Sequence, residues 1–149
     1  MYSKLFQLEE EVFKVLANEK RLEIMQLLRN GELNVSDMIL MLGLRQANLS
    51  QHLTLLRQVG LVDVNKKGRE IYYRIADEKM CNAIDLIHDF VRDKYNIGNN
   101  ESQSPFPIVV DPICGMRFSA CEAYDKITKS DGTTAYFCAS GCRETYLKS

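Results

Sequence analysis

The sequence lacks any long apolar stretch. Its longest clean run of apolar residues is MILML, at residues 38–42, which is far too short to cross a bilayer. The first residues, MYSKLFQLEEEVF, carry consecutive acids and have no apolar core of the kind that a secretory signal contains. We therefore expect a soluble, cytoplasmic protein that does not associate with membranes.

An excess of one charge is also missing, and histidine is scarce. The formal net charge is -1 and the pI is about 6.1, so no global basic field surrounds the protein. The sequence has only two histidines, and it contains no nucleophile–base pair and no phosphate-binding loop. These absences argue against catalysis, and we expect a protein that is not an enzyme.

Cysteine is present but unevenly placed. Cys81 stands alone, whereas the other four of the five cysteines all follow residue 113. In a small secreted module this density would predict disulfide bonds, but without a secretion signal it indicates metal or redox chemistry.

The composition divides the chain into two segments joined by a linker. Residues 1–97 are rich in helix formers, and residues 98–107, GNNESQSPFP, have the polar, glycine and proline content of a linker. Residues 108–149 are too few for a comfortable core, and modules of this size usually need a metal, a disulfide or a partner surface. We predict an α+β protein, with a mainly helical first domain and a small cysteine-rich α/β module.

The first segment has the pattern of a winged helix-turn-helix. NVSDMILMLG predicts a short helix capped by Asn34 or Ser36, and LRQANLSQHLTLLRQVG predicts a second helix that ends near Gly60. The segment LVDVNKKGREIYYRI then alternates in the manner of a β-hairpin, which would form the wing. Residues 77–95 return to a helical pattern with an apolar seam, and such a seam on a terminal helix predicts a homodimer.

Basic and amide side chains gather on this helix-turn-helix and wing. Between residues 39 and 69 the only acid is Asp63, so a phosphate backbone would favour this face. The second helix opens with side chains that can hydrogen-bond base edges. The candidate DNA-binding residues are Arg45, Gln46, Asn48, Ser50, Gln51, His52, Lys66, Lys67 and Arg69. The alternative is that the amides are caps and solvated surface, that the basic hairpin tip only confers solubility, and that His52 packs beneath its helix.

The stretches VLANEKRLEIMQLL, ELNVSDM, LSQHLTLLRQVGLV and KKGREIYYRI resemble the ArsR/SmtB family of metal-responsive repressors over residues 9–92. The resemblance implies a dimeric winged-helix repressor that leaves its operator DNA when an inducer binds. It also implies that Lys67 and Arg69 lie on the wing and that the recognition helix carries Gln46, Asn48, Ser50, Gln51 and His52. Arsenic-sensing members carry cysteines where this sequence has Asn34 and Ser36, so their thiolate site is missing here.

The cysteine-rich tail reads DPICGM and, further on, TTAYFCASGC. This pattern resembles the YHS domain, also called TRASH, over residues 109–147, and the resemblance implies heavy-metal binding by Cys114, Cys138 and Cys142. Thiolates are soft ligands that suit a thiophilic ion, Zn(II) or Cu(I). If Cys121 joins them, the site becomes a closed four-cysteine site, which favours zinc. The alternatives are a disulfide, a redox thiol and simple packing, although C-x3-C is not the usual redox spacing.

These observations combine into one functional hypothesis. We expect a DNA-binding transcriptional repressor whose operator affinity is controlled by a thiophilic metal ion at the C-terminal cysteine module. One alternative is a winged-helix regulator whose tail is a structural zinc knuckle for protein contact. The other is an intracellular thiol redox or metal-carrier protein.

Overall fold

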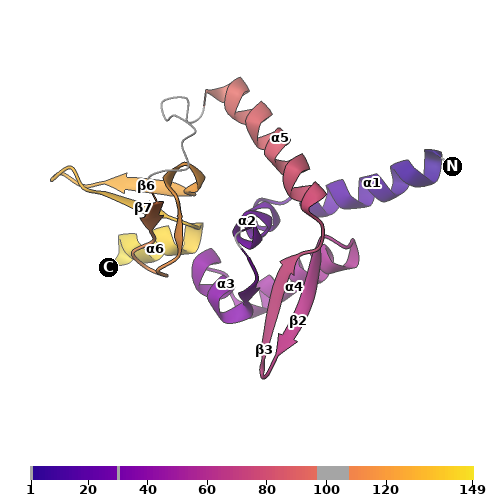
Figure 1. Ribbon diagram of the computed structural model, residues 1–149, viewed down its shortest axis with the longest axis horizontal. Coiled ribbons are helices and arrows are strands. Elements are labelled where there is room, and N and C mark those ends of the chain that lie inside the picture. Colours follow the sequence, from indigo (N-terminus) through magenta and orange to yellow (C-terminus); the bar gives the residue numbers. More distant parts are fainter. Residues whose placement is uncertain (1, 30, 97–107) are drawn as a thin grey trace. The chain divides into compact units, whose positions relative to one another are not determined.

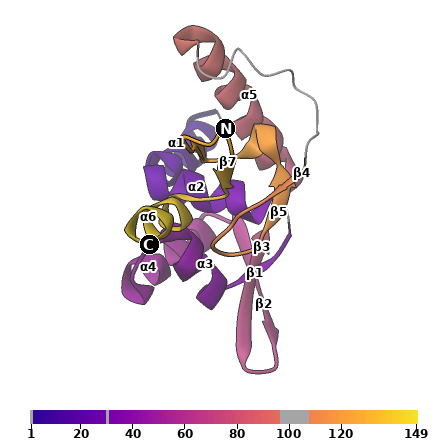
Figure 2. The ribbon, with the colours of Figure 1, turned by 90° about the vertical axis from the view of Figure 1, so that its left-hand side faces the viewer.

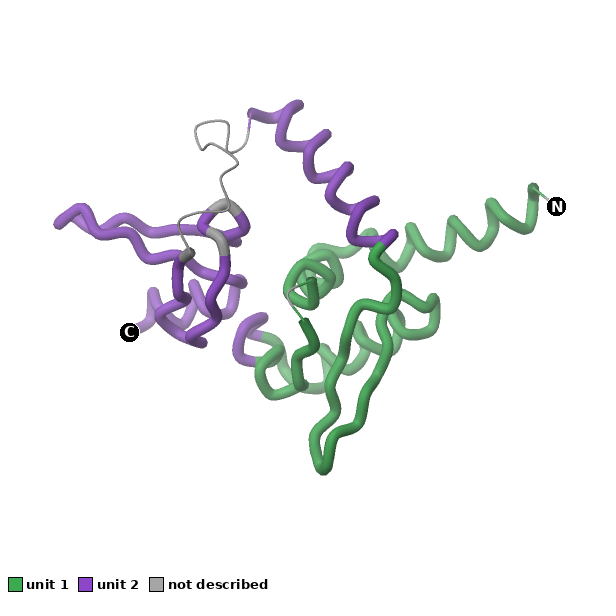
Figure 3. The backbone as a smooth tube through the Cα atoms, viewed as in Figure 1, with its two compact units in different colours: residues 1–39, 44–78 green, residues 40–43, 79–149 purple. Residues whose placement is uncertain are grey.

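The structure is a computed structural model that describes residues 2–29, 31–96 and 108–149, without the side chains of residues 108, 119 and 121. It forms two compact units, residues 1–39 with 44–78 and residues 40–43 with 79–149 (Figure 3). The expected linker at residues 98–107 lies outside the described residues, so the domain boundaries remain a prediction. The mixture of helices and small sheets confirms the α+β class (Figure 1).

Two of the four helices described in the first part of the chain begin after a polar capping residue. The four are α1 (Tyr2–Leu16), α2 (Glu19–Leu28), α3 (Val35–Leu42) and α4 (Gln46–Gln58). The Asn18 side chain accepts a hydrogen bond from the Arg21 N–H at 3.1 Å, and the Asn34 side chain accepts one from the Asp37 N–H at 2.8 Å. Such bonds satisfy backbone donors that a helix start leaves free. The predicted cap at Asn34 is therefore confirmed.

Helix α4 is anchored by the apolar side of its helical repeat. Leu49, Leu53 and Leu56 are buried, with Ile24 and Met38 among the other core residues of the same unit. The helix ends where Gly60 adopts a positive φ of 77° and the Leu61 N–H reaches back to the Leu56 carbonyl at 2.9 Å. Glycine has no Cβ to clash in this conformation, so it terminates the helix at little cost.

A three-stranded antiparallel sheet follows, with the strand order β1-β3-β2. Its strands are β1 (Leu33–Asn34), β2 (Val62–Lys67) and β3 (Glu70–Ile75). Lys67 pairs with Glu70 at the hairpin end, and Leu33 pairs with Tyr73. The β2–β3 hairpin projects as an arm in the view of Figure 2, which confirms the predicted wing. Strand β1 was not predicted.

Helix α5 (Glu78–Tyr95) carries the predicted apolar seam. Ile84 is buried, whereas Ile87 and Val91 are exposed, together with Leu86 and Phe90. The helix thus leaves a run of large apolar side chains uncovered in the single chain. Within the described parts of the chain, no helix combines the length and apolar character needed to span a bilayer.

The tail forms two short hairpins and a closing helix. The elements are β4 (Ile108–Val110), β5 (Arg117–Ser119), the 3-10 helix η1 (Ala120–Glu122), β6 (Asp125–Thr128), β7 (Thr134–Phe137) and α6 (Ser140–Lys148). Strand β4 pairs with β5, and β6 pairs with β7. Phe118 and Phe137 are buried, and the Phe137 ring lies 5.1 Å from the Tyr146 ring, centroid to centroid. This core is small, as the length of the tail requires.

Candidate metal centre and nucleic-acid interface

Three cysteines of the tail converge from three different elements. Cys114 lies in the turn after β4, Cys138 directly follows β7, and Cys142 lies in the first turn of α6. The Sγ atoms of Cys114 and Cys138 are 3.4 Å apart, and those of Cys138 and Cys142 are 3.9 Å apart. The structure thus brings together the three cysteines that the sequence proposed as ligands.

The spacing of these sulfurs fits a shared metal ion. A disulfide bond is about 2.05 Å long, and all three cysteines are free thiols. Zinc–sulfur bonds are about 2.3 Å, so two thiolates on one tetrahedral ion lie about 3.8 Å apart. The observed separations are close to that value. The donor set, three soft sulfurs, suits a thiophilic ion such as Zn(II) or Cu(I).

Asp111 completes the cluster, and sequence reasoning missed it as a site residue. A carboxylate oxygen of Asp111 and the three Sγ atoms all lie within 4.8 Å of one another. Asp111 is 1% exposed and accepts hydrogen bonds from the backbone N–H groups of Ile113, Cys114 and Cys138. The signal in the sequence was the Asp two positions before a turn residue, the spacing of an Asx-turn.

The turn that carries Cys114 has a tightly bonded backbone. The Asp111 N–H donates to the Met116 carbonyl, and the Gly115 N–H donates to the Asp111 carbonyl, both at 2.9 Å. Gly115 has a positive φ of 77°, a conformation that residues with a Cβ seldom adopt. The glycine after Cys114 is therefore what lets the chain fold back at this position.

Hydrogen bonding shifts the pKa values of the three thiols in opposite directions. Hydrogen bonds from Cys138 and Cys142 lower the pKa of the Cys114 thiol to about 3. Hydrogen bonding to Cys114, together with burial, raises the pKa of the Cys138 and Cys142 thiols above their ordinary range. Hydrogen bonds that favour the charged form of one member disfavour it in the neighbours. Of the three sulfurs, Cys114 is therefore the one whose thiolate form the hydrogen bonds favour.

The structure leaves the role of Cys121 open, and the burial of the other tail cysteines bears on the redox alternative. The backbone of Cys121 lies in η1, but its side chain is outside the described part of the structure, so its role as a ligand remains a prediction. Cys138 and Cys142 are buried. A redox thiol is typically accessible to its partner, and of the three converging cysteines Cys114 is the more exposed.

The amide-rich start of α4 presents its side chains to solvent. Arg45 is the residue before the helix, and all of the following are exposed: Arg45, Gln46, Asn48, Ser50 and Gln51. His52 differs, because it is half-buried and its Nδ1 atom is buried without a hydrogen-bond partner among the described residues. Desolvation, with the nearby charges of Arg21 and Lys20, lowers the pKa of His52. One ring nitrogen of His52 therefore faces the protein, as the packing alternative expected.

The basic residues of the wing lie at its tip and are exposed. They are Lys66, Lys67 and Arg69. Lys67 forms an ion pair with Glu32, and its Nζ lies 5.1 Å from the centroid of the Tyr72 ring. The Lys67 ammonium holds the pKa of the Glu32 carboxyl below its usual value. Lys67 thus already has partners within the chain.

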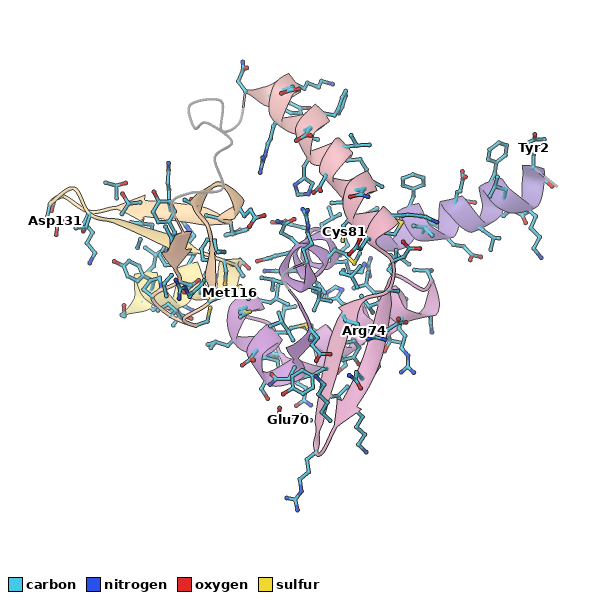
Figure 4. The ribbon with its side chains drawn as sticks, viewed as in Figure 1. Tyr2, Glu70, Arg74, Cys81, Met116 and Asp131 are labelled. Atoms are coloured by element: carbon cyan, nitrogen blue, oxygen red, sulfur yellow. The ribbon has the colours of Figure 1, made fainter. Side chains whose placement is uncertain are left out.

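Asn34 also serves the wing. Besides capping α3, its side-chain amide donates to the Glu70 carboxylate at 3.2 Å, and the Tyr72 hydroxyl donates to the same oxygen at 2.8 Å. Glu70 is labelled near the tip of the hairpin in Figure 4. Asn34 therefore links the start of α3 to the hairpin.

Comparison with known proteins identifies the helical part. The family described as "Bacterial regulatory protein, arsR family" matches residues 18–64. The transcriptional activator HlyU of Vibrio cholerae is 38% identical over 77 residues, which are 52% of this chain and 71% of HlyU. The arsenical resistance operon repressor of Escherichia coli is 43% identical over 72 residues, which are 48% of this chain and 62% of that protein.

A solved structure agrees with the fold. The homodimeric winged helix-turn-helix DNA-binding domain of a possible ArsR-family regulator from Mycobacterium bovis superposes with a TM-score of 0.61 at 29% identity, covering 68% of this chain and 94% of that one. The fold and the helix-turn-helix surface therefore define a winged-helix transcription regulator. The chain belongs to the arsR family of bacterial regulatory proteins. The family match ends at residue 64, before the cysteine-rich tail begins.

Proposed function

We propose that this chain is a homodimeric, operator-binding repressor of the cytoplasm whose grip on DNA is controlled by a thiophilic metal ion in its tail. The observation that carries the proposal is the convergence of Cys114, Cys138 and Cys142, with sulfur separations of 3.4 and 3.9 Å. We assign the winged-helix domain to residues 1–97, the linker to residues 98–107 and a YHS-type metal module to residues 108–149.

Operator binding is proposed from the helix-turn-helix and wing. Exposed amides and hydroxyls at the start of a recognition helix can reach base edges in the major groove, whereas basic residues contact phosphates. The amides Gln46, Asn48 and Gln51 would supply the base contacts. The basic residues Arg45, Lys66, Lys67 and Arg69 would supply the phosphate contacts. Ser50 would contact either a base or a phosphate, and His52 would pack between α4 and the rest of the protein.

Dimerisation is proposed from α5. Leu86 is 71% exposed and Phe90 is 65% exposed, and Ile87 and Val91 extend the same run of exposed apolar residues. Large apolar side chains at three- and four-residue steps on one helix suit pairing with a second copy of that helix. The related Mycobacterium bovis domain is described as homodimeric, which supports the same assembly here.

Metal control is proposed because the family's own thiolate positions hold Asn34 and Ser36, while the tail gathers three thiols. Among the relatives are repressors or regulators named for arsenical and cadmium resistance. In this chain, Cys114, Cys138 and Cys142 would hold a Zn(II) or Cu(I) ion, with Cys121 as an additional candidate. A metal that binds the DNA-free form better than the DNA-bound form would release the operator.

The test is operator binding with and without metal. An operator selected from a random duplex pool is titrated by fluorescence anisotropy with the full-length protein, with and without Zn(II) or Cu(I). The double variant Cys138→Ser, Cys142→Ser is compared with Cys81→Ser, a matched change of a thiol outside the tail. We expect the metal to weaken operator binding in wild type and in Cys81→Ser, and to leave the double variant unchanged.

Three other outcomes contradict the proposal in different ways. An equal metal response in the double variant would show that the tail is not the sensor. Bound zinc that resists chelation without changing operator affinity would identify a structural zinc knuckle. Failure to select any preferred duplex at moderate salt would favour an intracellular metal carrier or thiol redox protein.

A further inference from the structure

We infer that Asp111 is the residue that assembles the metal site, holding two cysteine segments in place and leaving the ion a donor set of three sulfurs. The inference rests on the proposed binding of metal by the tail and concerns how that same site is built. It assigns Asp111 a positioning role and excludes it from direct coordination.

Both oxygens of the Asp111 carboxylate accept hydrogen bonds from the backbone. Its Oδ1 accepts from the Ile113 N–H at 2.7 Å and from the Cys114 N–H at 3.2 Å. Its Oδ2 accepts from the Cys138 N–H at 2.8 Å. One side chain therefore fixes the backbone at two of the three sulfur-bearing residues, although Cys138 lies 27 positions further along the chain.

The Asp111 side chain is also buried. Asp111 is 1% exposed, and a buried carboxylate is costly unless hydrogen bonds satisfy it. The three N–H groups meet that requirement. These three bonds use three of the roughly four lone-pair sites of the carboxylate and involve both of its oxygens, so the side chain cannot turn toward an ion without giving up backbone bonds.

The hydrogen bonds of Asp111 determine which atoms of the cluster face an ion. With Asp111 occupied, the atoms left to face an ion are the sulfurs of Cys114, Cys138 and Cys142, which lie within 4.8 Å of one another. Three thiolates without a hard oxygen ligand favour a soft ion such as Cu(I). Groups that orient metal ligands typically change metal affinity about 10- to 100-fold when they are mutated.

The experiment uses full-length protein loaded with Cu(I) and, separately, with Zn(II). X-ray absorption at the metal edge counts sulfur and oxygen neighbours, and competition with a chromophoric Cu(I) chelator gives the affinity. Asp111→Asn preserves size and shape but places an amide N–H₂ or a weaker acceptor against the backbone donors. Asp131→Asn is the matched control, because Asp131 also accepts from a neighbouring backbone, the Thr133 N–H at 2.8 Å, at the exposed tip of the β6–β7 hairpin (Figure 4).

We expect wild-type Cu(I) protein to show only sulfur neighbours from the protein. Asp111→Asn should keep that sulfur shell with Cu(I) affinity lowered about 10- to 100-fold, and Asp131→Asn should match wild type. In metal-free protein, amide exchange at Cys138 should be faster in Asp111→Asn than in wild type.

Two results overturn the inference while leaving the proposed metal binding intact. One is a protein oxygen in the wild-type Cu(I) shell, a result that needs no variant to fold. The other is an Asp111→Asn affinity equal to that of wild type. A wild-type protein that takes up neither ion overturns the proposed metal control, and this inference with it.

Discussion

The carboxylate of Glu32 and the ammonium of Lys67 form an ion pair between residues 35 positions apart. Glu32 directly precedes β1, and Lys67 is the last residue of β2, so the pair joins the edge of the sheet to the end of the wing. The Tyr72 ring lies beside the same ammonium. A DNA phosphate that contacts Lys67 must therefore compete with an acid of the same chain.

This competition predicts that Glu32→Gln strengthens binding to random duplex DNA. The change removes a negative charge and releases Lys67 for a phosphate, so the affinity should rise several-fold at low salt and the salt dependence should steepen. The measurement is fluorescence anisotropy across a range of salt concentrations. Glu10→Gln is the control, because it changes the net charge equally and breaks the exposed Lys14–Glu10 pair on α1. An equal gain from both variants would mean that only net charge matters.

Substituting a residue that contacts bases and one that contacts phosphates should change DNA binding in different ways. Gln51→Ala should reduce the preference for operator over random DNA, and a lost base contact typically costs about 1–3 kcal/mol. Lys66→Ala should weaken binding to both DNAs alike and flatten the salt slope. Both side chains are exposed, Gln51 on α4 and Lys66 on β2. Parallel titrations of selected and random duplexes check this, and identical effects of the two variants would contradict the assigned roles.

His52 should make stability fall in mild acid. Burial and the charges of Arg21 and Lys20 lower its pKa in the folded protein, whereas in the unfolded chain it takes up a proton near pH 6.5. The unfolded state therefore binds more protons below about pH 6.5, and the free energy of unfolding falls as the pH drops. Denaturant unfolding of wild type and His52→Gln at pH 7.5 and 5.5 tests this. A difference between them that does not change with pH would refute it.

The packing of α4 predicts that truncating its buried leucine lowers the free energy of unfolding much more than truncating an exposed leucine of the same helix. Leu53 is 1% exposed, whereas Leu55 is 38% exposed. Leu53→Ala leaves a cavity in the core and should lower the free energy of unfolding by about 2–5 kcal/mol. Leu55→Ala should cost less than about 1 kcal/mol. Equilibrium unfolding in urea measures both, and comparable losses would show that the helix does not pack as described.

The features that the sequence predicted well depend on nearby residues. The cap at Asn34, the end of α4 at Gly60 and the hairpin between Lys67 and Glu70 all follow from residues a few positions apart. Local propensity and turn chemistry are sufficient for such elements. The helix-turn-helix and wing could therefore be predicted without any knowledge of distant contacts.

The features that were missed depend on contacts between distant residues. Strand β1 has two residues and exists because Leu33 and Asn34 pair with Tyr73 and Tyr72. Asp111 acts through the backbone of Cys138, and no residue type marks a backbone N–H as a partner. The three cysteines were found because their chemistry is visible in their identity. Asp111, which positions them, shows only a local Asx-turn spacing in the sequence, and that spacing does not reveal its bond to Cys138.

The tail has a small core, and its three thiols come from separate segments, so a bound ion would act as a cross-link. A ligand that binds only the folded form adds stability as the logarithm of its concentration, about 1.4 kcal/mol for each tenfold rise above the dissociation constant. The order of residues 108–149 would then depend on the supply of free metal. The free energy of unfolding of the module would rise with the logarithm of the free ion concentration, because folding and metal binding are coupled in one equilibrium.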